Sequence, residues 1–139
     1  MTKKIITCIT CPLGCTIAVC GEGGEIASME GSKCKRGEEY AQNEFTHPVR
    51  ILTTTVRVEN ADSPLVAVRS DKPISKKLLM QCMAEIKNVA VMAPVRRYDI
   101  IIPNILGTDA NIVATGEVGE KTQYRQHNST SSHNTSSVT

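Results

Sequence analysis

Aromatic side chains are scarce in this chain of 139 residues, which has no tryptophan, one phenylalanine and three tyrosines. Hydrophobic residues nevertheless make up 40% of the sequence, so the core must be built from aliphatic side chains. A strong charge imbalance is also absent, because 16 Lys and Arg residues face 14 Asp and Glu residues. Nucleic-acid binding depends on a clearly basic surface, so this balance argues against that task. The length suits one domain, or one small lobe and one modest core domain.

Long hydrophobic runs are missing as well. No stretch approaches the roughly 20 apolar residues that a membrane-spanning helix needs. A cysteine appears as early as position 8, which leaves no room for the hydrophobic segment of a secretory signal peptide. We therefore expect a cytoplasmic protein in a reducing environment, where the six cysteines stay free instead of forming a disulfide framework.

Cysteine, by contrast, is concentrated in one stretch. Five of the six cysteines lie between Cys8 and Gly37, and three of them form the pattern Cys-x2-Cys-x3-Cys within eight residues. An iron–sulfur cluster must be held by thiolates from several sides, and a tight loop with three cysteines supplies one of them. Pro12 and Gly14 favour such a loop, because proline fixes φ and glycine permits positive φ. The predicted ligands in this loop are Cys8, Cys11 and Cys15.

A fourth thiolate must be returned to this loop by the chain that follows. Residues 16–29 are expected to form a β-hairpin, with its turn at 21–24, that brings Cys34 back beside the loop. Positive charge around a cysteine stabilises both its thiolate and an anionic cluster, so Cys34 is the preferred fourth ligand. The basic residues that surround it, and that are candidates for tuning or docking, are Lys33, Lys35 and Arg36.

The cofactor predicted from this spacing is a 4Fe–4S cluster, with two alternatives left open. Zn²⁺ also binds four thiolates well, although common zinc modules pair two Cys-x2-Cys knuckles and the second half here offers a single cysteine. A reactive redox thiol is the other alternative. The choice of fourth ligand is open too, since Cys20 lies five residues after Cys15, where it also fits a small buried hydrophobe of a strand.

The chain as a whole predicts an α+β fold. We expect a small N-terminal cysteine-rich lobe with a β-hairpin over 1–46 and a small mixed β-sheet domain with one main amphipathic helix over 47–118. The final stretch, 119–139, is polar and lacks periodicity, so we expect a disordered tail.

Within this frame, hydrophobic periodicity predicts the individual elements. A short helix is expected over 38–45, and strands at 51–58, 65–69, 89–95 and 111–115. The stretch 99–106 is interrupted by Pro103, so it is expected to form an edge strand or two short strands. Ser75 is the expected N-cap of the main helix. One apolar stripe of that helix should face the core, and it consists of Leu78, Leu79, Cys82, Met83 and Ile86.

The cysteine segment resembles the N-terminal 4Fe–4S segment of molybdopterin oxidoreductases. The tetrapeptide 34–37 stands where that family has Cys-x-Lys-Gly, and Arg36 takes the place of a lysine thought to lie between cluster and pterin. The excursion between the third and fourth cysteines is shorter here, and the large pterin-binding domains are missing. The resemblance therefore implies a cluster but not a molybdenum cofactor.

A second resemblance covers nearly the whole chain up to about Val118. The strings CPLGC, CKRGEEYA, HPVRILTTTVRV and NILGT are similar to the DUF1667 family of small uncharacterised proteins. These are typically encoded beside FAD-dependent glycerol-3-phosphate dehydrogenase-like and NAD(P)/FAD oxidoreductase-like proteins. The resemblance implies that such flavoproteins are the partners of this chain.

The sequence contains no motif-placed nucleophile–base pair, paired carboxylates or phosphate-binding glycine loop. We therefore doubt that the chain is an enzyme by itself, and expect a non-catalytic electron-transfer subunit of an oxidoreductase complex. Its cluster would relay electrons to or from the partner flavoprotein, whose flavin would perform the substrate chemistry. The alternative is a zinc-stabilised structural adaptor with no redox role.

Overall fold

The computed structural model describes residues 1–122, which form a mixed α+β structure with two α-helices and three sheets. The first sheet is antiparallel and has the order β1-β2-β3. Its strands are β1 (Thr2–Thr7), β2 (Thr16–Glu22) and β3 (Glu25–Glu30). The predicted hairpin over 16–29 is confirmed by the pairing of β2 with β3, whereas β1 is a strand that the sequence analysis did not predict.

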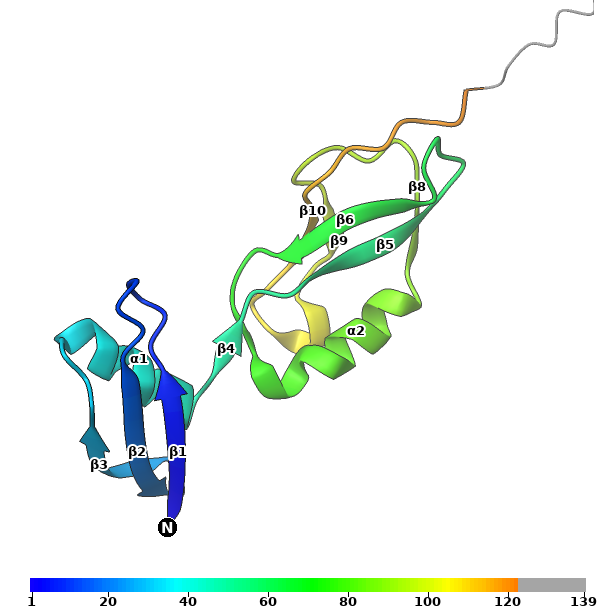
Figure 1. The fold of residues 1–139 in the computed structure, drawn as a ribbon. Coiled ribbons are helices and arrows are strands. Elements are labelled where there is room, and N and C mark those ends of the chain that lie inside the picture. The colour runs from blue at the N-terminus through cyan, green and yellow to red at the C-terminus, as the bar shows by residue number, and fades with distance from the viewer. Residues whose placement is uncertain (123–139) are drawn as a thin grey trace, which may run out of the picture.

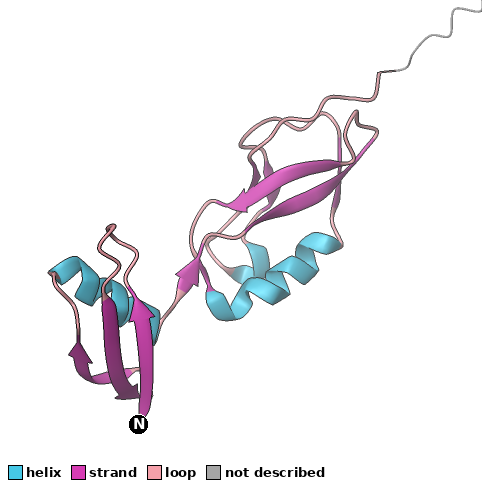
Figure 2. Ribbon diagram, viewed as in Figure 1, coloured by secondary structure: helices cyan, strands magenta, loops and turns pink. Residues whose placement is uncertain are grey.

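Helix α1 (Lys35–Thr46) follows this sheet and packs against it (Figures 1 and 2). A small apolar cluster lies between the helix and the sheet. Its buried members are Ile6, Cys8, Ile17, Val19 and Ala41. The helix begins earlier than the predicted residue 38, because Lys35, Arg36 and Gly37 also adopt helical geometry.

The largest sheet has five strands in the order β8-β5-β6-β10-β9. The strands are β5 (Thr53–Glu59), β6 (Leu65–Ser70), β8 (Ala90–Met92), β9 (Ile100–Ile102) and β10 (Ile112–Ala114). Only the β5–β8 pair is parallel among the pairs of this sheet, so the predicted mixed sheet is confirmed. A 3-10 turn, η2 (Ile105–Gly107), connects β9 to β10.

Helix α2 (Leu79–Lys87) packs against β5 and lies in the crossover from β6 to β8 (Figure 1). Cys82 and Ile86 are buried, as the apolar stripe predicts, and they join a cluster of fifteen buried side chains. Two details of the prediction are wrong. Met83 is exposed, because it lies on the side of α2 that turns away from the core. Ser75 makes no side-chain capping bond, because the 3-10 turn η1 (Lys76–Leu78) separates it from the α-helix.

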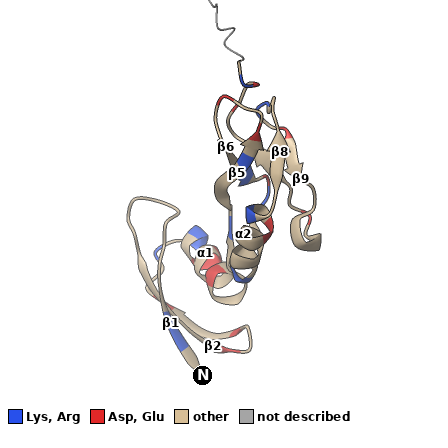
Figure 3. Cartoon of the chain, turned by 90° about the vertical axis from the view of Figure 1, so that its right-hand side faces the viewer, with Lys and Arg blue, Asp and Glu red and all other residues tan. Residues whose placement is uncertain are grey.

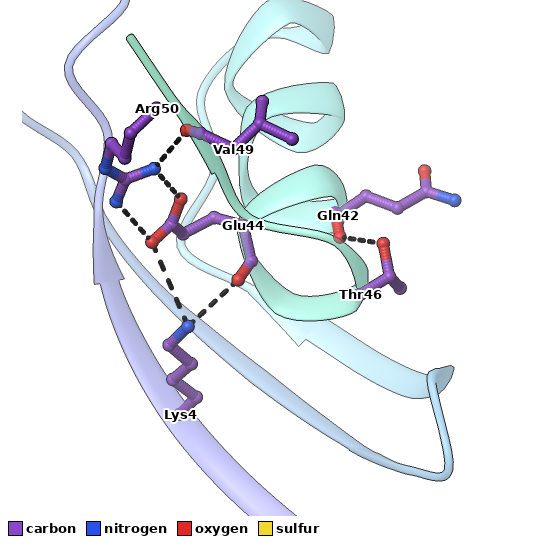
Figure 4. A network of polar contacts seen from close by, with 6 residues as sticks. All are labelled: Lys4, Gln42, Glu44, Thr46, Val49 and Arg50. Atoms are coloured by element: carbon purple, nitrogen blue, oxygen red, sulfur yellow. Dashed lines mark hydrogen bonds and ion pairs between the residues drawn. The ribbon is translucent and has the colours of Figure 1, made fainter. Parts of the chain in front are cut away.

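The segment after α1 connects the first sheet to the five-stranded one. Strand β4 (Val49–Arg50) pairs with β7 (Ile74–Ser75) in a short two-stranded ladder. The Arg50 guanidinium donates two hydrogen bonds of 2.8 and 2.9 Å to the Glu44 carboxylate at the end of α1. Lys4 Nζ of β1 donates to the Glu44 backbone carbonyl at 2.9 Å (Figure 4). Glu44 therefore joins β1, α1 and β4 at one point.

Residues 119–122 of the predicted tail lie within the described part of the chain. The Gly119 carbonyl accepts a hydrogen bond from the Asp62 N–H, and the Lys121 N–H donates to the Asn60 carbonyl. The rest of the predicted tail, 123–139, lies outside the described residues. Among residues 1–122, no helix combines the length and the apolar character needed to cross a membrane.

Candidate metal centre

The cysteine loop connects β1 to β2. Thr7 pairs with Thr16, so the loop begins and ends at one edge of the ladder. The Cys8 N–H donates to the Cys15 carbonyl at 2.8 Å and closes the loop, while the Gly14 N–H donates to the Cys11 carbonyl at 3.4 Å. Gly14 has a φ of 58°, the left-handed geometry for which a glycine was expected at this turn. Strand pairing thus holds the three cysteines in one short loop.

Cys34 lies immediately before α1 and is exposed, whereas Cys8 is buried. Gly37, one helical turn after Cys34, is buried and shows where the two thiols lie. A Cβ atom built on Gly37 would be 3.6 Å from Cys8 Sγ and 3.8 Å from Cys34 Sγ. The two sulfurs therefore converge on the same side of the helix, beside a position with no side chain.

The start of α1 also shapes the electrostatics of this place. The unpaired N–H groups at a helix N-terminus carry a partial positive charge, which favours negative charge nearby. Hydrogen bonds from the Thr10 side chain and backbone lower the pKa of the Cys8 thiol, and the charge of Arg36 lowers this pKa further. Cys8 Sγ and Thr10 Oγ1 are 3.0 Å apart. The surroundings of Cys8 thus favour its thiolate, the form that binds metals.

The other two predicted ligands, Cys11 and Cys15, lie in the same loop and are half-buried. Within residues 1–122, however, no three His, Cys, Asp or Glu side chains are close enough together to hold a metal ion as they stand. The structure brings Cys8 and Cys34 together beside Gly37 and leaves Cys11 and Cys15 on the adjoining loop. The donor set, four thiols at one end of the sheet, fits a thiolate-ligated cluster in its chemistry.

The two remaining cysteines lie elsewhere. Cys20 is in β2 opposite Lys3 and Ser28, five residues beyond Cys15, which corresponds to roughly 16 Å along an extended strand. Cys82 is fully buried in α2, where burial raises the pKa of its thiol.

The basic side chains predicted to surround Cys34 are exposed. Lys33 lies just before Cys34, and Lys35 and Arg36 are the first two residues of α1. Figure 3 shows basic residues at the start of α1 and acidic residues further along it. Two large apolar side chains of the cysteine loop are exposed as well, Ile9 to 75% and Leu13 to 71%.

Sequence reasoning assigned no role in this site to Thr10, and it noted Gly37 only as part of the tetrapeptide 34–37. Gly37 follows Cys34 at a spacing of three, which in a helix places it on the same face one turn later. The predicted helix began at residue 38, so this spacing could be recognised only after the structure showed that α1 begins at Lys35. The role of Thr10 depends on the loop conformation, which no spacing pattern specifies.

The chain belongs to the family described as "Protein of unknown function (DUF1667)", which matches residues 35–116. Membership in this small-protein family, suggested by the sequence resemblance, is thereby confirmed. The match begins directly after Cys34 and contains both helices and the whole five-stranded sheet.

One solved structure is similar in fold, the NMR structure of protein CPE0013 from Clostridium perfringens. It aligns with a TM-score of 0.50 and 22% sequence identity, over 57% of this chain and 94% of that one. This likeness concerns the fold alone. No curated protein matches the chain.

Proposed function

We propose that this protein is an electron-transfer subunit that carries a 4Fe–4S cluster on Cys8, Cys11, Cys15 and Cys34. The observation that carries the proposal is the convergence of Cys8 Sγ and Cys34 Sγ beside Gly37, from segments 26 residues apart. No side chain at position 37 separates the two thiols. Bound there, a cluster would supply one-electron transfer, and the four thiolates would hold it.

The residues of the chain have separate tasks in this proposal. Thr10 favours the thiolate of Cys8 by hydrogen bonding, and Arg36 adds positive charge next to it. Lys33 and Lys35 are exposed beside Cys34, where they would attract an acidic surface of a partner. The exposure of Cys34 and of the cysteine loop keeps the site within reach of that partner.

The partner we propose is an FAD-dependent dehydrogenase of the glycerol-3-phosphate dehydrogenase-like class, together with an NAD(P)/FAD oxidoreductase-like subunit. The flavin would perform the substrate chemistry, and this chain would take no catalytic part. The proposed location is the cytoplasm, where reduced thiols persist.

The test is metal and sulfide analysis of protein purified without oxygen, combined with visible absorption spectra. We expect about four iron atoms and a brown protein. Cys8→Ser, Cys11→Ser, Cys15→Ser and Cys34→Ser should each lose or convert the cluster. Cys20→Ser is the matched control from the same sheet and should keep it.

A colourless protein with one zinc would overturn the electron-transfer role in favour of a structural adaptor. Loss of iron in Cys20→Ser but not in Cys34→Ser would replace the proposed ligand set with one that includes Cys20. For the basic segment, Lys33→Gln and Lys35→Gln should slow electron transfer from the flavoprotein and weaken its salt dependence.

A further inference from the structure

A groove outside the cysteine loop lies between β5 and α2, with an open volume of about 700 Å³. In Figure 1, α2 runs along β5, and the chain then leaves the helix to form β8. The groove is lined by Thr54, Thr55 and Arg57 of β5, by Leu65 of β6, and by the outer side and C-terminal end of α2. Its floor thus includes one strand of the five-stranded sheet.

That strand has a free edge in the groove. Strand β8 pairs with β5 only at residues 57–59, so the first half of β5 has no neighbour on this side among the described strands. The Val58 N–H donates to the Pro64 carbonyl on the β6 side, whereas the Glu59 carbonyl accepts from Ala93 on the β8 side. Because directions alternate along a strand, the N–H and C=O groups of Thr53 and Thr55 point toward the groove.

The opposite wall of the groove is apolar and unusually exposed. Met80 is 79% exposed and Met83 is 37% exposed, and both line the groove together with Ala84. Methionine side chains are flexible and adapt to different apolar partners, so they recur at peptide-binding surfaces. A free strand edge opposite an apolar helix wall is the arrangement that binds extended peptides by strand addition.

The charges of the groove have one sign. Its two charged lining residues are Arg57 and Lys87, and no Asp or Glu belongs to the lining. Both residues are exposed, and Figure 3 shows basic and acidic segments on β5 and on α2. A ligand that fits this groove must therefore offer apolar and acidic side chains along an extended backbone.

We propose that the β5–α2 groove binds a short extended segment of a partner protein that alternates apolar and acidic residues. The segment pairs with β5 at Thr53 and Thr55. It lies on the same side of β5 as β8, which pairs with the later residues of that strand. Its apolar side chains contact Met80 and Met83, and its carboxylates lie near Arg57 and Lys87. This inference is independent of any metal on the cysteine loop.

Two other occupants fit the groove less well. The last 17 residues of the chain, 123–139, contain no Asp or Glu and few apolar residues, so they offer neither kind of contact. A second copy of the chain, joined edge to edge through β5, would bring the same positive charges together. Charge complementarity thus favours a different protein.

The test is an NMR titration of the ¹⁵N-labelled full chain with a capped hexapeptide of alternating glutamate and valine. We expect amide shift changes confined to Thr53, Thr55 and the outer side of α2. Two further peptides are methylated on alternate backbone nitrogens, in the two possible phases. Methylation removes the N–H donors of alternate residues, so one of the two peptides cannot donate to β5 and should bind at least about tenfold more weakly than the parent. The other should bind like the parent. The weak binder cannot recover by shifting its register by one residue, because that shift would turn its apolar and acidic side chains to the wrong faces.

Charge is tested with variants and with a matched peptide. Arg57→Gln and Lys87→Gln should each weaken binding about threefold to fivefold, the size expected of an exposed ion pair. Arg97→Gln, an exposed arginine outside the groove, is the control and should leave binding unchanged. An alternating lysine–valine peptide should bind at least about tenfold more weakly, since both its charges and those of the groove are positive.

Several results would overturn the proposal. Equal binding of the two methylated peptides would exclude strand addition, and equal binding of the lysine peptide would exclude the charge match. Shift changes at the edge of β9 instead of β5 would place the binding elsewhere. Shifts of Thr53 and Thr55 that depend on protein concentration, without any peptide effect, would assign the edge to self-association.

Discussion

The N-terminal region (residues 1–46) and the C-terminal region (residues 47–122) bury cores of very different size. The first cluster contains five buried side chains and the second fifteen. The smaller core also includes Cys8, one of the proposed metal ligands. Units of fewer than about 70 residues rarely gain enough stability from burial alone and often rely on a metal or disulfides.

The difference suggests that the proposed cluster would stabilise the N-terminal region in addition to transferring electrons. In the C-terminal region the single cysteine, Cys82, is one apolar side chain among many. In the N-terminal region the four proposed ligands lie at the edge of the small core, in the β1–β2 loop and at the start of α1. Metal ligation there would add to the folding free energy, because metal binding and folding are coupled when the ligands come from separate segments.

The largest effect is expected from removing one buried isoleucine from each core. Ile17 and Ile112 are both fully buried, so Ile17→Ala and Ile112→Ala should each cost about 2–5 kcal/mol. For metal-free protein we expect Ile17→Ala to unfold the N-terminal region, while Ile112→Ala leaves the larger core weakened but folded. Amide hydrogen exchange followed by NMR reports on each region separately.

The metal-free protein is prepared with a chelator, and the control is the wild-type chain treated in the same way. In this control, the amides of β1, β2 and α1 should keep measurable protection from hydrogen exchange. If each variant loses protection both in the amides of the five-stranded sheet and in those of the N-terminal region, the two regions unfold as one unit. The comparison between them would then have no thermodynamic meaning.

The second prediction concerns the contact that joins the two regions. The Glu44 carboxylate is 11% exposed and accepts two hydrogen bonds from Arg50, so Glu44→Gln should cost about 1–2 kcal/mol after allowance for solvent screening. Urea denaturation at pH 7 measures the change. The matched control is Asp109→Asn, which removes an exposed ion pair with Lys72 at 3.3 Å and should have almost no effect.

The same carboxylate gives this contact a pH dependence. The Arg50 hydrogen bonds lower the pKa of Glu44 below its ordinary value of 4.5, so the unfolded chain binds a proton at this group more readily than the folded one. Its stabilisation is therefore complete above pH 4.5 and is lost as the pH falls through the lowered pKa. Glu44→Gln should flatten this part of the stability profile, and an unchanged profile would show that Glu44 is not responsible.

The sequence predicted well those elements whose signal is local. Strands β5 and β6 alternate buried and exposed residues, and the buried Val56 and Val58 share one face of β5 within the predicted strand 51–58. The hairpin of β2 and β3 was indicated by its glycine turn. The concentration of cysteines in the β1–β2 loop was visible as well, because the spacing of ligands is itself local.

Elements that depend on non-local pairing could not be predicted. Strand β1 has one buried residue, Ile6, and is extended because it pairs with β2 across the cysteine loop. Strands β4 and β7 have two residues each, and each is defined by its pairing with the other. Met83 fits an apolar stripe, but α2 has a protein layer on one side only, so the edge of the stripe stays exposed. The position of Gly37 beside two thiols also depends on the packing of segments far apart in the sequence, so no local pattern could predict it.

The smallest effect concerns the C-terminal limit of the larger region. Val95 and Val118 exchange two backbone hydrogen bonds of 2.9 Å, and the next residues continue this contact through Asp62–Gly119 at 3.1 Å and Asn60–Lys121 at 3.0 Å. A chain that ends at residue 118 loses the last two bonds and should be less stable by about 1 kcal/mol. A chain that ends at residue 122 keeps them and should match the full chain within about 0.5 kcal/mol, because the polar residues beyond have little apolar surface to bury. Urea midpoints of the three chains measure the difference. Equal midpoints for the two shortened chains would show that residues 119–122 add nothing, and a large loss for both would place stabilising contacts beyond residue 122.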